Sequence, residues 1–329
     1  MQQSLPDHPG RLTLSVVVPV YNEAKVIGEL HRRLQRVMDA VGESWEFIYV
    51  NDGSSDTTLH EIEALQASDS HVSVVNLSRN FGKEIATTAG PDHAVGTAVI
   101  VMDGDLQDPP EVIPSLIAAW RSGADMVCAQ RRRRDGDTWL KKSTAAMFYR
   151  LMRRLGDVPL PPNVGDFRLM SRRVVDAVLQ LREHHRFMKG LFAWVGFPTV
   201  IVLYDREPRG GGTTKWSFWK LWNLAIEGIT SFSVGPLKLA TYLGLATAGF
   251  AAVFAAQLVA RTLLFGNPVA GYPSLMAVVL FLGGVQLITL GIIGEYLARV
   301  FNETKQRPLY LVERYVPSRD AFSTAKPVT

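Results

Sequence analysis

Cysteine is nearly absent from the sequence. The 329 residues include a single one, Cys128, within the apolar run 126–129. One cysteine can form neither an internal disulfide nor a cysteine-cluster metal site, so the composition suits a reducing compartment. We interpret Cys128 as a residue of the hydrophobic core and not as a reactive thiol.

Glycine-rich phosphate loops are absent too. The chain contains no G-x-x-x-x-G-K-[ST], and its first strand-to-helix turn lacks G-x-G-x-x-G. These absences argue against a P-loop and a dinucleotide-binding fold, so a metal ion would have to hold any nucleotide phosphate. The formal net charge of +4 is modest, and without a nucleic-acid-binding motif we expect no nucleic acid as a partner.

Charge is scarce in one long stretch, because only Arg261 is charged between residues 239 and 294. Segments 239–264 and 274–297 are each long enough to cross a hydrocarbon core of roughly 30 Å. Their link, 265–273, has no Lys or Arg, whereas the outer flanks are basic. The positive-inside rule therefore predicts two transmembrane helices with both termini in the cytosol.

The two ends of the chain fit this orientation. The first 11 residues are polar and contain no apolar signal-peptide core, so we expect the N-terminal part to stay in the cytosol. Near the other end, Glu295 and Arg299 lie four residues apart and are expected to pair at the cytosolic edge of the second apolar segment. The polar tail 302–329 supports no assignment.

The first half of the chain alternates apolar, β-branched runs with helical patterns. Strands are predicted at 14–18, 47–50, 72–77, 98–102 and 125–129, and helices at 26–41, 57–66, 83–94, 112–120 and 173–181. This alternation predicts an α/β fold with a mostly parallel sheet and helices on both faces. In such sheets ligands bind at the carboxyl ends of the strands. Polar residues gather at these ends, namely Tyr21, Glu23, Asp52, Asp56, Lys83, Asp103 and Asp105.

Two carboxylates follow the fourth predicted strand. Asp103 and Asp105 would point the same way if the strand geometry persists that far, because side chains alternate along a strand. Gly104 between them lets a ligand approach the backbone closely. Together with Gln107, these oxygen donors suit Mg²⁺ or Mn²⁺ shared with a diphosphate. The alternative is a solvated acidic turn closed by the two prolines that follow.

Basic residues gather beyond the fifth strand and in a glycine-rich loop over 206–215. Such residues commonly form a solvated face, but here they lie between the predicted site and the apolar segments. Phosphate on a membrane lipid is the partner that they fit. The candidate acceptor-phosphate residues are Arg131, Lys142, Arg206, Arg209 and Lys215.

Three tryptophans, Trp216, Trp219 and Trp222, directly follow that loop. Tryptophan beside lysine is typical of an amphipathic segment that lies in the bilayer interface. A helix packed on the sheet is the alternative. These parts together indicate a soluble nucleotide-activated donor and an anionic acceptor in the membrane.

The sequence resembles the polyisoprenyl-phosphate glycosyltransferases of glycosyltransferase family 2. It is most similar to the bacterial bactoprenol-phosphate glucosyltransferases, which are related to dolichol-phosphate mannose synthase. The resemblance covers residues 16–312, and its motifs lie at 18–23, 51–56, 78–84, 102–110, 165–169 and 291–296. Each motif is modest alone, but their order together with two apolar segments is specific.

This resemblance implies a GT-A fold and assigns residues to each part of the site. The donor residues are Pro19, Tyr21, Glu23, Asp52, Lys83, Asp103, Gly104 and Asp105. The metal ligands are Asp103, Asp105 and Gln107, and the catalytic residues are Asp166 and Asp105, with Asp166 at the position proposed as the base. The sequence departs from the family pattern at two places. It has Asp-Gly-Asp at 103–105 where relatives often have Asp-Ala-Asp, and Gly-Thr-Thr-Lys at 212–215 where they often have Gly-x-Ser-Lys. Both departures weaken the assignment of the sugar more than that of the reaction class.

The resemblance also implies the reaction and its setting. The expected reaction moves glucose from UDP-glucose to undecaprenyl phosphate with inversion, in a homotetramer at the bacterial plasma membrane. Mannose, galactose, aminoarabinose and N-acetylated sugars stay open as alternatives. The expected division of the chain is a cytosolic GT-A domain (1–214), an interfacial region (215–235), a two-helix transmembrane domain (236–300) and a cytosolic tail (301–329).

Two other functions are considered. A processive polysaccharide synthase would share the aspartates, but it would carry Gln-x-x-Arg-Trp, which this chain lacks. A non-catalytic membrane scaffold with a decayed transferase domain would have lost some polar strand-end residues, yet all are present.

Overall fold

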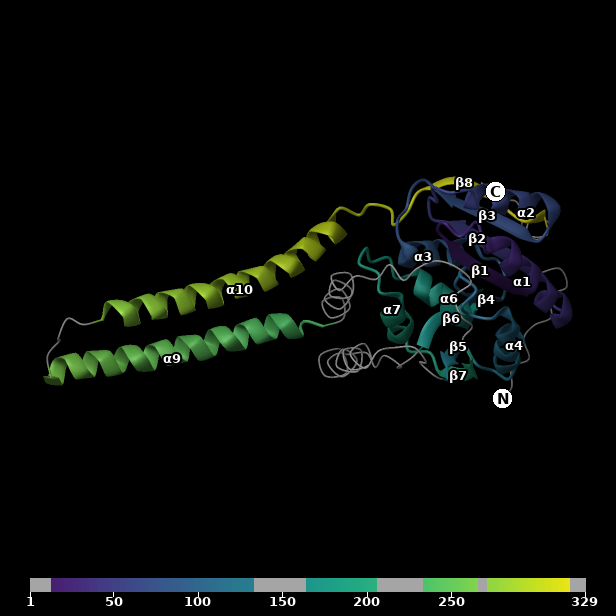
Figure 1. Ribbon diagram of the computed structural model, residues 1–329. Coiled ribbons are helices and arrows are strands. Elements are labelled where there is room, and N and C mark those ends of the chain that lie inside the picture. Colours follow the sequence, from purple (N-terminus) through teal and green to yellow (C-terminus); the bar gives the residue numbers. More distant parts are fainter. Residues whose placement is uncertain (1–12, 133–163, 206–232, 266–270, 320–329) are drawn as a thin grey trace, which may run out of the picture.

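An eight-stranded mixed sheet forms the centre of the molecule. The computed structural model describes residues 13–132, 164–205, 233–265 and 271–319 (Figure 1). The strands are β1 (Leu14–Val20), β2 (Trp45–Asn51), β3 (Val72–Leu77), β4 (Ala98–Val101), β5 (Met126–Arg131), β6 (Val164–Ser171), β7 (Thr199–Tyr204) and β8 (Val312–Val316). Their order in the sheet is β7-β5-β6-β4-β1-β2-β3-β8.

Parallel pairs predominate in the sheet. The pairs β1–β2, β2–β3, β1–β4 and β5–β7 run parallel. Antiparallel pairing is confined to β6, which lies between β4 and β5, and to β8, which lies beside β3. The predicted α/β fold with a mostly parallel sheet is thus confirmed. Because β6 enters antiparallel, its amino end lies at the same edge as the carboxyl end of β4.

Helices cover both faces of the sheet. They are α1 (Ile27–Val41), α2 (Thr58–Ser68), α3 (Lys83–His93), the 3₁₀ turn η1 (Pro110–Val112), α4 (Ile113–Arg121), α6 (Arg172–Leu179) and α7 (Met188–Trp194). Alternate residues of β1 face opposite sides, since Val16 and Val18 pack with α1, α2 and α4, whereas Val17 packs with α3, α6 and α7. Cys128 is buried in the second of these two cores, as predicted.

The sequence missed three strands. β6, β7 and β8 were not predicted, and the helix before β5 proved to be η1 followed by α4. β4 also ends at Val101, one residue before the predicted end, because the chain turns immediately afterwards. The remaining predicted strands and helices are present, with ends displaced by a few residues.

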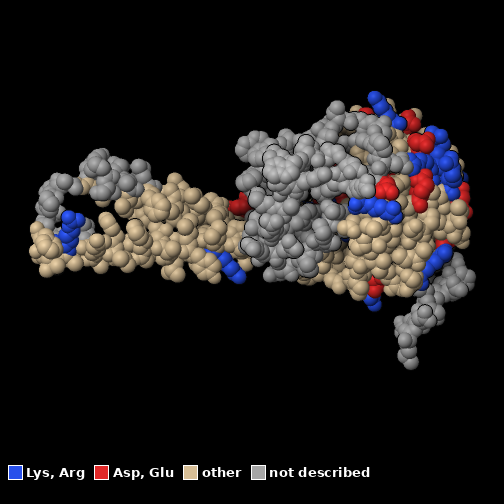
Figure 2. All heavy atoms as spheres, turned by 60° about the horizontal axis from the view of Figure 1, so that its bottom comes forward, with Lys and Arg blue, Asp and Glu red and all other residues tan. Residues whose placement is uncertain are grey.

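Two long helices form a hairpin beside the sheet domain (Figure 1). α9 (Gly235–Phe265) and α10 (Tyr272–Thr304) are both long and apolar enough to cross a membrane. Almost none of their apolar surface is buried within the chain. The face shown in Figure 2 carries many charged side chains over the sheet domain and only isolated basic ones along the hairpin. The predicted pair at its end is present, with Arg299 Nη2 lying 3.2 Å from Glu295 Oε1.

After α10 the chain returns to the sheet domain. The tail was left unassigned from its sequence, but it forms β8, which pairs antiparallel with β3 at the sheet edge. Side chains strengthen this pairing, because Asn76 Nδ2 donates to Glu313 Oε2 at 2.8 Å and Arg314 pairs with Glu63. The sheet therefore holds the chain that follows α10 through β8.

Candidate functional site

Loops from β1 and β2 meet at the carboxyl edge of the sheet. Asn22 adopts a left-handed backbone conformation with φ of 56°, and its Oδ1 accepts a hydrogen bond from the backbone N–H of Ser55 at 2.8 Å. The backbone N–H of Glu23 donates to Thr58 Oγ1 at 2.9 Å. Pro19 is buried within β1, whereas Tyr21 is 46% exposed beside this edge. These contacts fix the first two predicted loops to each other.

Asp52 holds the loop that precedes α3. Its Oδ1 accepts the backbone N–H of Phe81 at 2.7 Å, and its Oδ2 accepts that of Gly82 at 3.0 Å. Burial raises the pKa of the Asp52 carboxyl, and the two backbone donors offset part of that rise. Gly82 has φ of 99°, a conformation that favours glycine. These two hydrogen bonds to Asp52 fix the position of the next residue, Lys83.

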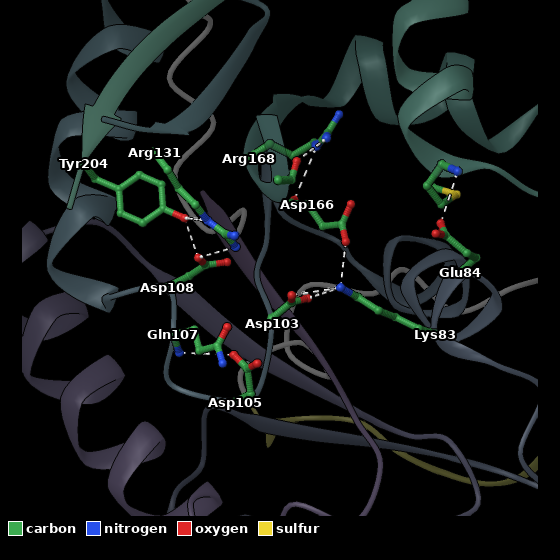
Figure 3. Close-up of polar contacts among 12 residues, drawn as sticks. Lys83, Glu84, Asp103, Asp105, Gln107, Asp108, Arg131, Asp166, Arg168 and Tyr204 are labelled. Atoms are coloured by element: carbon green, nitrogen blue, oxygen red, sulfur yellow. Dashed lines mark hydrogen bonds and ion pairs between the residues drawn. The ribbon is translucent and has the colours of Figure 1, made fainter. Parts of the chain in front are cut away.

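Lys83 joins two carboxylates that come from different strands (Figure 3). Its Nζ lies 2.7 Å from Asp103 Oδ1, 2.8 Å from Asp103 Oδ2 and 2.7 Å from Asp166 Oδ2. Asp103 follows β4, and Asp166 lies in β6, so the antiparallel entry of β6 brings the two together. The structure thus brings together three residues that the sequence assigned to separate motifs.

Charge within this cluster sets the ionisation of its members. Burial opposes ionisation of Asp166, but the ammonium groups of Lys83 and Lys189 outweigh it and lower its pKa. Burial raises the pKa of Asp103, and Lys83 offsets only part of that rise. Lys83 is itself partly desolvated, yet the two carboxylates raise its pKa. The ammonium is therefore firmly protonated, and it carries the only positive charge in direct contact with the pair among the described residues.

Asp105 lies in a turn and not on a strand. Its Oδ1 accepts the backbone N–H of Gln107 at 3.1 Å, and Leu106 between them has φ of 59°. Since β4 ends at Val101, strand geometry does not extend to Asp103 and Asp105, and the condition under which they were expected to converge is not met. In Figure 3 the Asp103 carboxylate points toward Lys83, whereas Asp105 lies beside Gln107.

Gly104 packs against the end of β1. A Cβ atom at this position would lie 2.7 Å from Val20 Cγ1 and 3.3 Å from the backbone oxygen of Pro19. The side of Gly104 where a side chain would project is thus filled by the protein. The glycine allows the turn to lie close to β1.

A buried triangle of side chains joins this turn to β5 and β7. The Tyr204 hydroxyl donates to Asp108 Oδ1, and Arg131 Nε donates to the Tyr204 hydroxyl at 3.1 Å. Arg131 Nη2 also lies 3.5 Å from Asp108 Oδ1. Asp108 is only 1% exposed. Burial and the nearby carboxylate raise the pKa of Tyr204, so the hydroxyl stays protonated and can donate.

Sequence reasoning missed Asp108, Tyr204 and Glu84. Asp108 stands in the same acidic motif as Asp105, and Glu84 directly follows Lys83, so their positions were visible although their partners were not. Glu84 Oε2 accepts the backbone N–H of Met188 at 3.1 Å. Burial, together with the negative charge of Asp166, raises the pKa of Glu84 to about 7.

Of the predicted acceptor-phosphate residues, only Arg131 lies in the described part of the chain, and it is held by Asp108 and Tyr204. Lys142, Arg206, Arg209 and Lys215 lie outside the described residues. The three tryptophans of the predicted interfacial segment lie outside them as well.

The donor set suits a hard divalent cation. Asp103 already binds a cationic group, the Lys83 ammonium, at 2.7 Å. Within the described residues no group of three or more His, Cys, Asp or Glu side chains could hold a metal ion. If Asp103, Asp105 and Gln107 held such an ion, substrate and water would have to complete its shell, as is usual for Mg²⁺ with phosphates.

Comparison with known proteins decides the family. Residues 15–179 match the family described as "Glycosyl transferase family 2". The chain belongs to glycosyltransferase family 2. This family 2 glycosyltransferase also matches the "GtrB C-terminal hairpin" over residues 235–300, which contain α9 and most of α10. The expected activity class and GT-A fold are thereby confirmed.

The enzyme has similar relatives along nearly its whole length. It is 54% identical to an uncharacterized glycosyltransferase of Synechocystis sp., over 92% of this chain and 95% of that one. It is 48% identical to a prophage bactoprenol glucosyl transferase homolog of Escherichia coli K12, over 92% of this chain and 99% of that one. Among solved structures, mannosyl-3-phosphoglycerate synthase from Rubrobacter xylanophilus is 18% identical, with a TM-score of 0.45 over 66% of this chain and 71% of that one.

Proposed function

We propose that this family 2 glycosyltransferase transfers a single sugar from a nucleotide donor to a polyprenyl phosphate, with glucose from UDP-glucose as the first candidate. Relatives about half identical in sequence bear the name bactoprenol glucosyl transferase. The observation that carries the proposal is the meeting of Asp103, Asp166 and Lys83 at the carboxyl edge of β4. Sheets of this type commonly bind ligands at that edge, and the chain also has an apolar hairpin.

Asp103 and Asp105, with Gln107, would hold Mg²⁺ or Mn²⁺. Such an ion neutralises charge on the departing nucleoside diphosphate when it is bound. Asp103 would keep the diphosphate at the carboxyl end of β4, and the turn around Asp105 would fix the second carboxylate. Tyr21, Glu23 and the loop held by Asp52 lie at the same edge and would contact the rest of the donor.

Asp166 would orient the acceptor and stabilise charge. A phosphate monoester has a second pKa near about 6, so it is mostly a dianion at neutral pH and needs little help from a general base. The lowered pKa of Asp166 agrees with this role, because a strongly acidic carboxyl is a weak base. We propose in-line attack of the lipid phosphate on the anomeric carbon, with inversion.

The hairpin would anchor the catalytic domain to the membrane that contains the acceptor. We propose that α9 and α10 both cross the bilayer, that residues 1–214 and 301–329 face the cytosol, and that 215–235 lie at the interface. Homotetramer formation at the bacterial plasma membrane belongs to the same proposal. The length and apolar surface of both helices support the two crossings.

The decisive experiment supplies the purified enzyme with undecaprenyl phosphate, Mg²⁺ or Mn²⁺ and a panel of labelled nucleotide sugars. We expect one label, first of all glucose, to enter the lipid phase as a single unit per lipid. A long polymer would instead indicate a polysaccharide synthase. Donor binding without any transfer would indicate a scaffold.

A further inference from the structure

Lys83 is the most exposed member of its cluster. Its side chain is 49% exposed, whereas those of Asp103 and Asp166 are 24% and 12% exposed. The two carboxylates are thus held within the sheet edge, while the lysine reaches them from the first turn of α3 along a solvent-accessible path. It can move away from either carboxylate without opening the core.

The position of the ammonium conflicts with metal binding at Asp103. Nζ lies within 2.8 Å of both oxygens of that carboxylate. A divalent cation on the same oxygens would lie at about 2.1 Å and bring two further positive charges. The two cations repel each other at such a separation, so both cannot keep full contact with Asp103.

The Asp166 carboxylate is a second partner for the Lys83 ammonium. Asp166 Oδ2 already accepts from Nζ at 2.7 Å. Its other oxygen, Oδ1, is buried and has no hydrogen-bond partner among the described residues. Asp166 can therefore retain the ammonium after Asp103 has released it.

We propose that Lys83 is a resident cation that occupies Asp103 in the absence of metal, competes with the divalent ion for that carboxylate, and withdraws to Asp166 when the ion binds. This inference rests on the proposed function for the identity of the metal ligands. In this exchange each of the two carboxylates keeps contact with a cation at every stage. It also places a positive charge beside the reacting phosphates only once the site is loaded.

Metal binding without any sugar transfer tests the competition. Binding of Mn²⁺ to the full-length wild type and to Lys83→Met is measured by electron paramagnetic resonance, from the loss of the signal of free Mn²⁺. We expect Lys83→Met to bind Mn²⁺ about threefold to tenfold more tightly, since it removes a half-exposed competing charge. Lys83→Arg, which keeps the charge, should bind close to the wild-type value. Equal or weaker binding by Lys83→Met overturns the proposal.

A matched control separates competition from a general effect of charge. Lys189 also acts on Asp166 through its charge, but in the described residues it has no hydrogen bond to Asp103. Lys189→Met should therefore change the Mn²⁺ affinity less than twofold. A gain equal to that of Lys83→Met would show that direct occupation of Asp103 is not the cause, and the proposal would fail.

Asp105→Ala distinguishes this inference from the proposed function. If Asp105→Ala leaves Mn²⁺ binding intact, the metal site itself is misassigned. If it abolishes binding while Lys83→Met changes nothing, only the competition is refuted.

The wild-type chain offers a test that needs no folded variant. Mass spectrometry can quantify acylation of Lys83, with Lys189 as the internal reference. Mn²⁺ should increase the labelling of Lys83, because the ammonium loses one of its two carboxylate partners. Unchanged or reduced labelling would contradict the exchange.

Discussion

The acidic side chains at the sheet edge serve two purposes. Some carry negative charge into the proposed site, and others accept hydrogen bonds that fix the backbone around it. Asp103, Asp105 and Asp166 belong to the first group. Asp52 belongs to the second as well as to the predicted donor pocket, because both of its oxygens accept backbone N–H groups that fix the loop before Lys83. Substitutions of the two kinds should therefore differ in what they change.

The carboxylates should differ in their effect on transfer. With donor in excess, Asp105→Ala should reduce turnover by at least about a thousandfold, because it removes charge stabilisation of the leaving group. Asp166→Asn should leave more activity, with a loss of about tenfold to a hundredfold, because the acceptor is already ionised. Asp125 lies before β5, where it pairs with Arg173 and accepts a hydrogen bond from Ser171 Oγ. Asp125→Asn gives up the ion pair but keeps an oxygen that can accept from Ser171, so its turnover should match the wild type. Normal turnover by Asp105→Ala would exclude the metal assignment.

Substitution of Gly104 tests whether this glycine serves the packing of the turn on β1 or the choice of sugar. Gly104→Ala should lower the unfolding temperature, with a destabilisation of about 1 kcal/mol, because its Cβ would meet Val20. The ratios of kcat/KM among nucleotide sugars should stay unchanged, since the added methyl group faces β1. Val20→Ala in the same chain should relieve part of the loss. A changed donor preference would instead show that this position contacts the sugar.

Glu84 should make stability depend on pH near neutrality. Its pKa is raised to about 7 in the folded chain, from a usual value of 4.5. A carboxyl whose pKa is raised by folding stabilises the fold below its unfolded pKa, and this contribution is lost as the pH rises through about 7. The stability of the wild type relative to Glu84→Gln should thus fall between pH 5 and pH 8, by no more than about 3 kcal/mol. Thermal unfolding across this range measures it. Glu29→Gln on the surface of α1 should show no such trend.

At the scale of elements, the acidic turn that follows β4 is tied to the ends of β5 and β7. Asp108 contacts Tyr204 at the end of β7 and Arg131 at the end of β5. This triangle links the proposed donor site to the strands that lead into residues 133–163 and 206–232. Substitution of any one of these three side chains should therefore destabilise the turn and both strands.

Tyr204→Phe should destabilise the enzyme by about 1 to 3 kcal/mol, because it removes the hydroxyl donor from a buried carboxylate. Asp108→Asn in the same chain should recover part of this loss, because it removes a buried charge whose remaining partner is Arg131 at 3.5 Å. Unfolding of the wild type, both single variants and the double variant gives the coupling between the two positions. Strictly additive effects would show that the hydroxyl and the carboxylate do not depend on each other.

The elements also show where sequence reasoning succeeds. Residues 72–77 are rich in valine and end on a leucine, so β3 was predicted with its correct bounds. β8 could not be predicted, because it has only five residues, four of them are exposed, and its partner β3 lies more than 230 positions earlier. β6 includes a charged pair, Asp166 and Arg168, and only the fold shows that the Arg168 guanidinium packs 3.7 Å from the Phe192 ring centroid. The sequence thus identified Asp166 but could not place it beside Asp103.

At the scale of the whole molecule, the proposed reaction requires a soluble site to meet a substrate in the bilayer. The end of α10 is attached to the linker between α6 and α7. The backbone N–H of His184 donates to Glu303 Oε1 at 2.7 Å, and His184 Nε2 lies 2.7 Å from the backbone oxygen of Arg307. Together with β8, these contacts set how the sheet domain stands on its hairpin.

Glu303→Ala should loosen that attachment without touching the active site. Distances between spin labels on α4 and α9 should spread over a wider range, because Glu303→Ala removes the hydrogen bonds to His184. Transfer to bilayer-embedded polyprenyl phosphate should fall about twofold to fivefold, in line with the loss of about 1 kcal/mol of partly exposed hydrogen bonding. Glu295→Ala is the matched control, because Glu295 pairs with Arg299 on the same helix and should leave both measurements unchanged. The contacts of Glu303 are with His184 and not with Asp103 or Asp166. The affinity of Glu303→Ala for Mn²⁺ should therefore equal that of the wild type. An unchanged distance distribution in Glu303→Ala would show that the Glu303 contacts with His184 do not set the position of the hairpin.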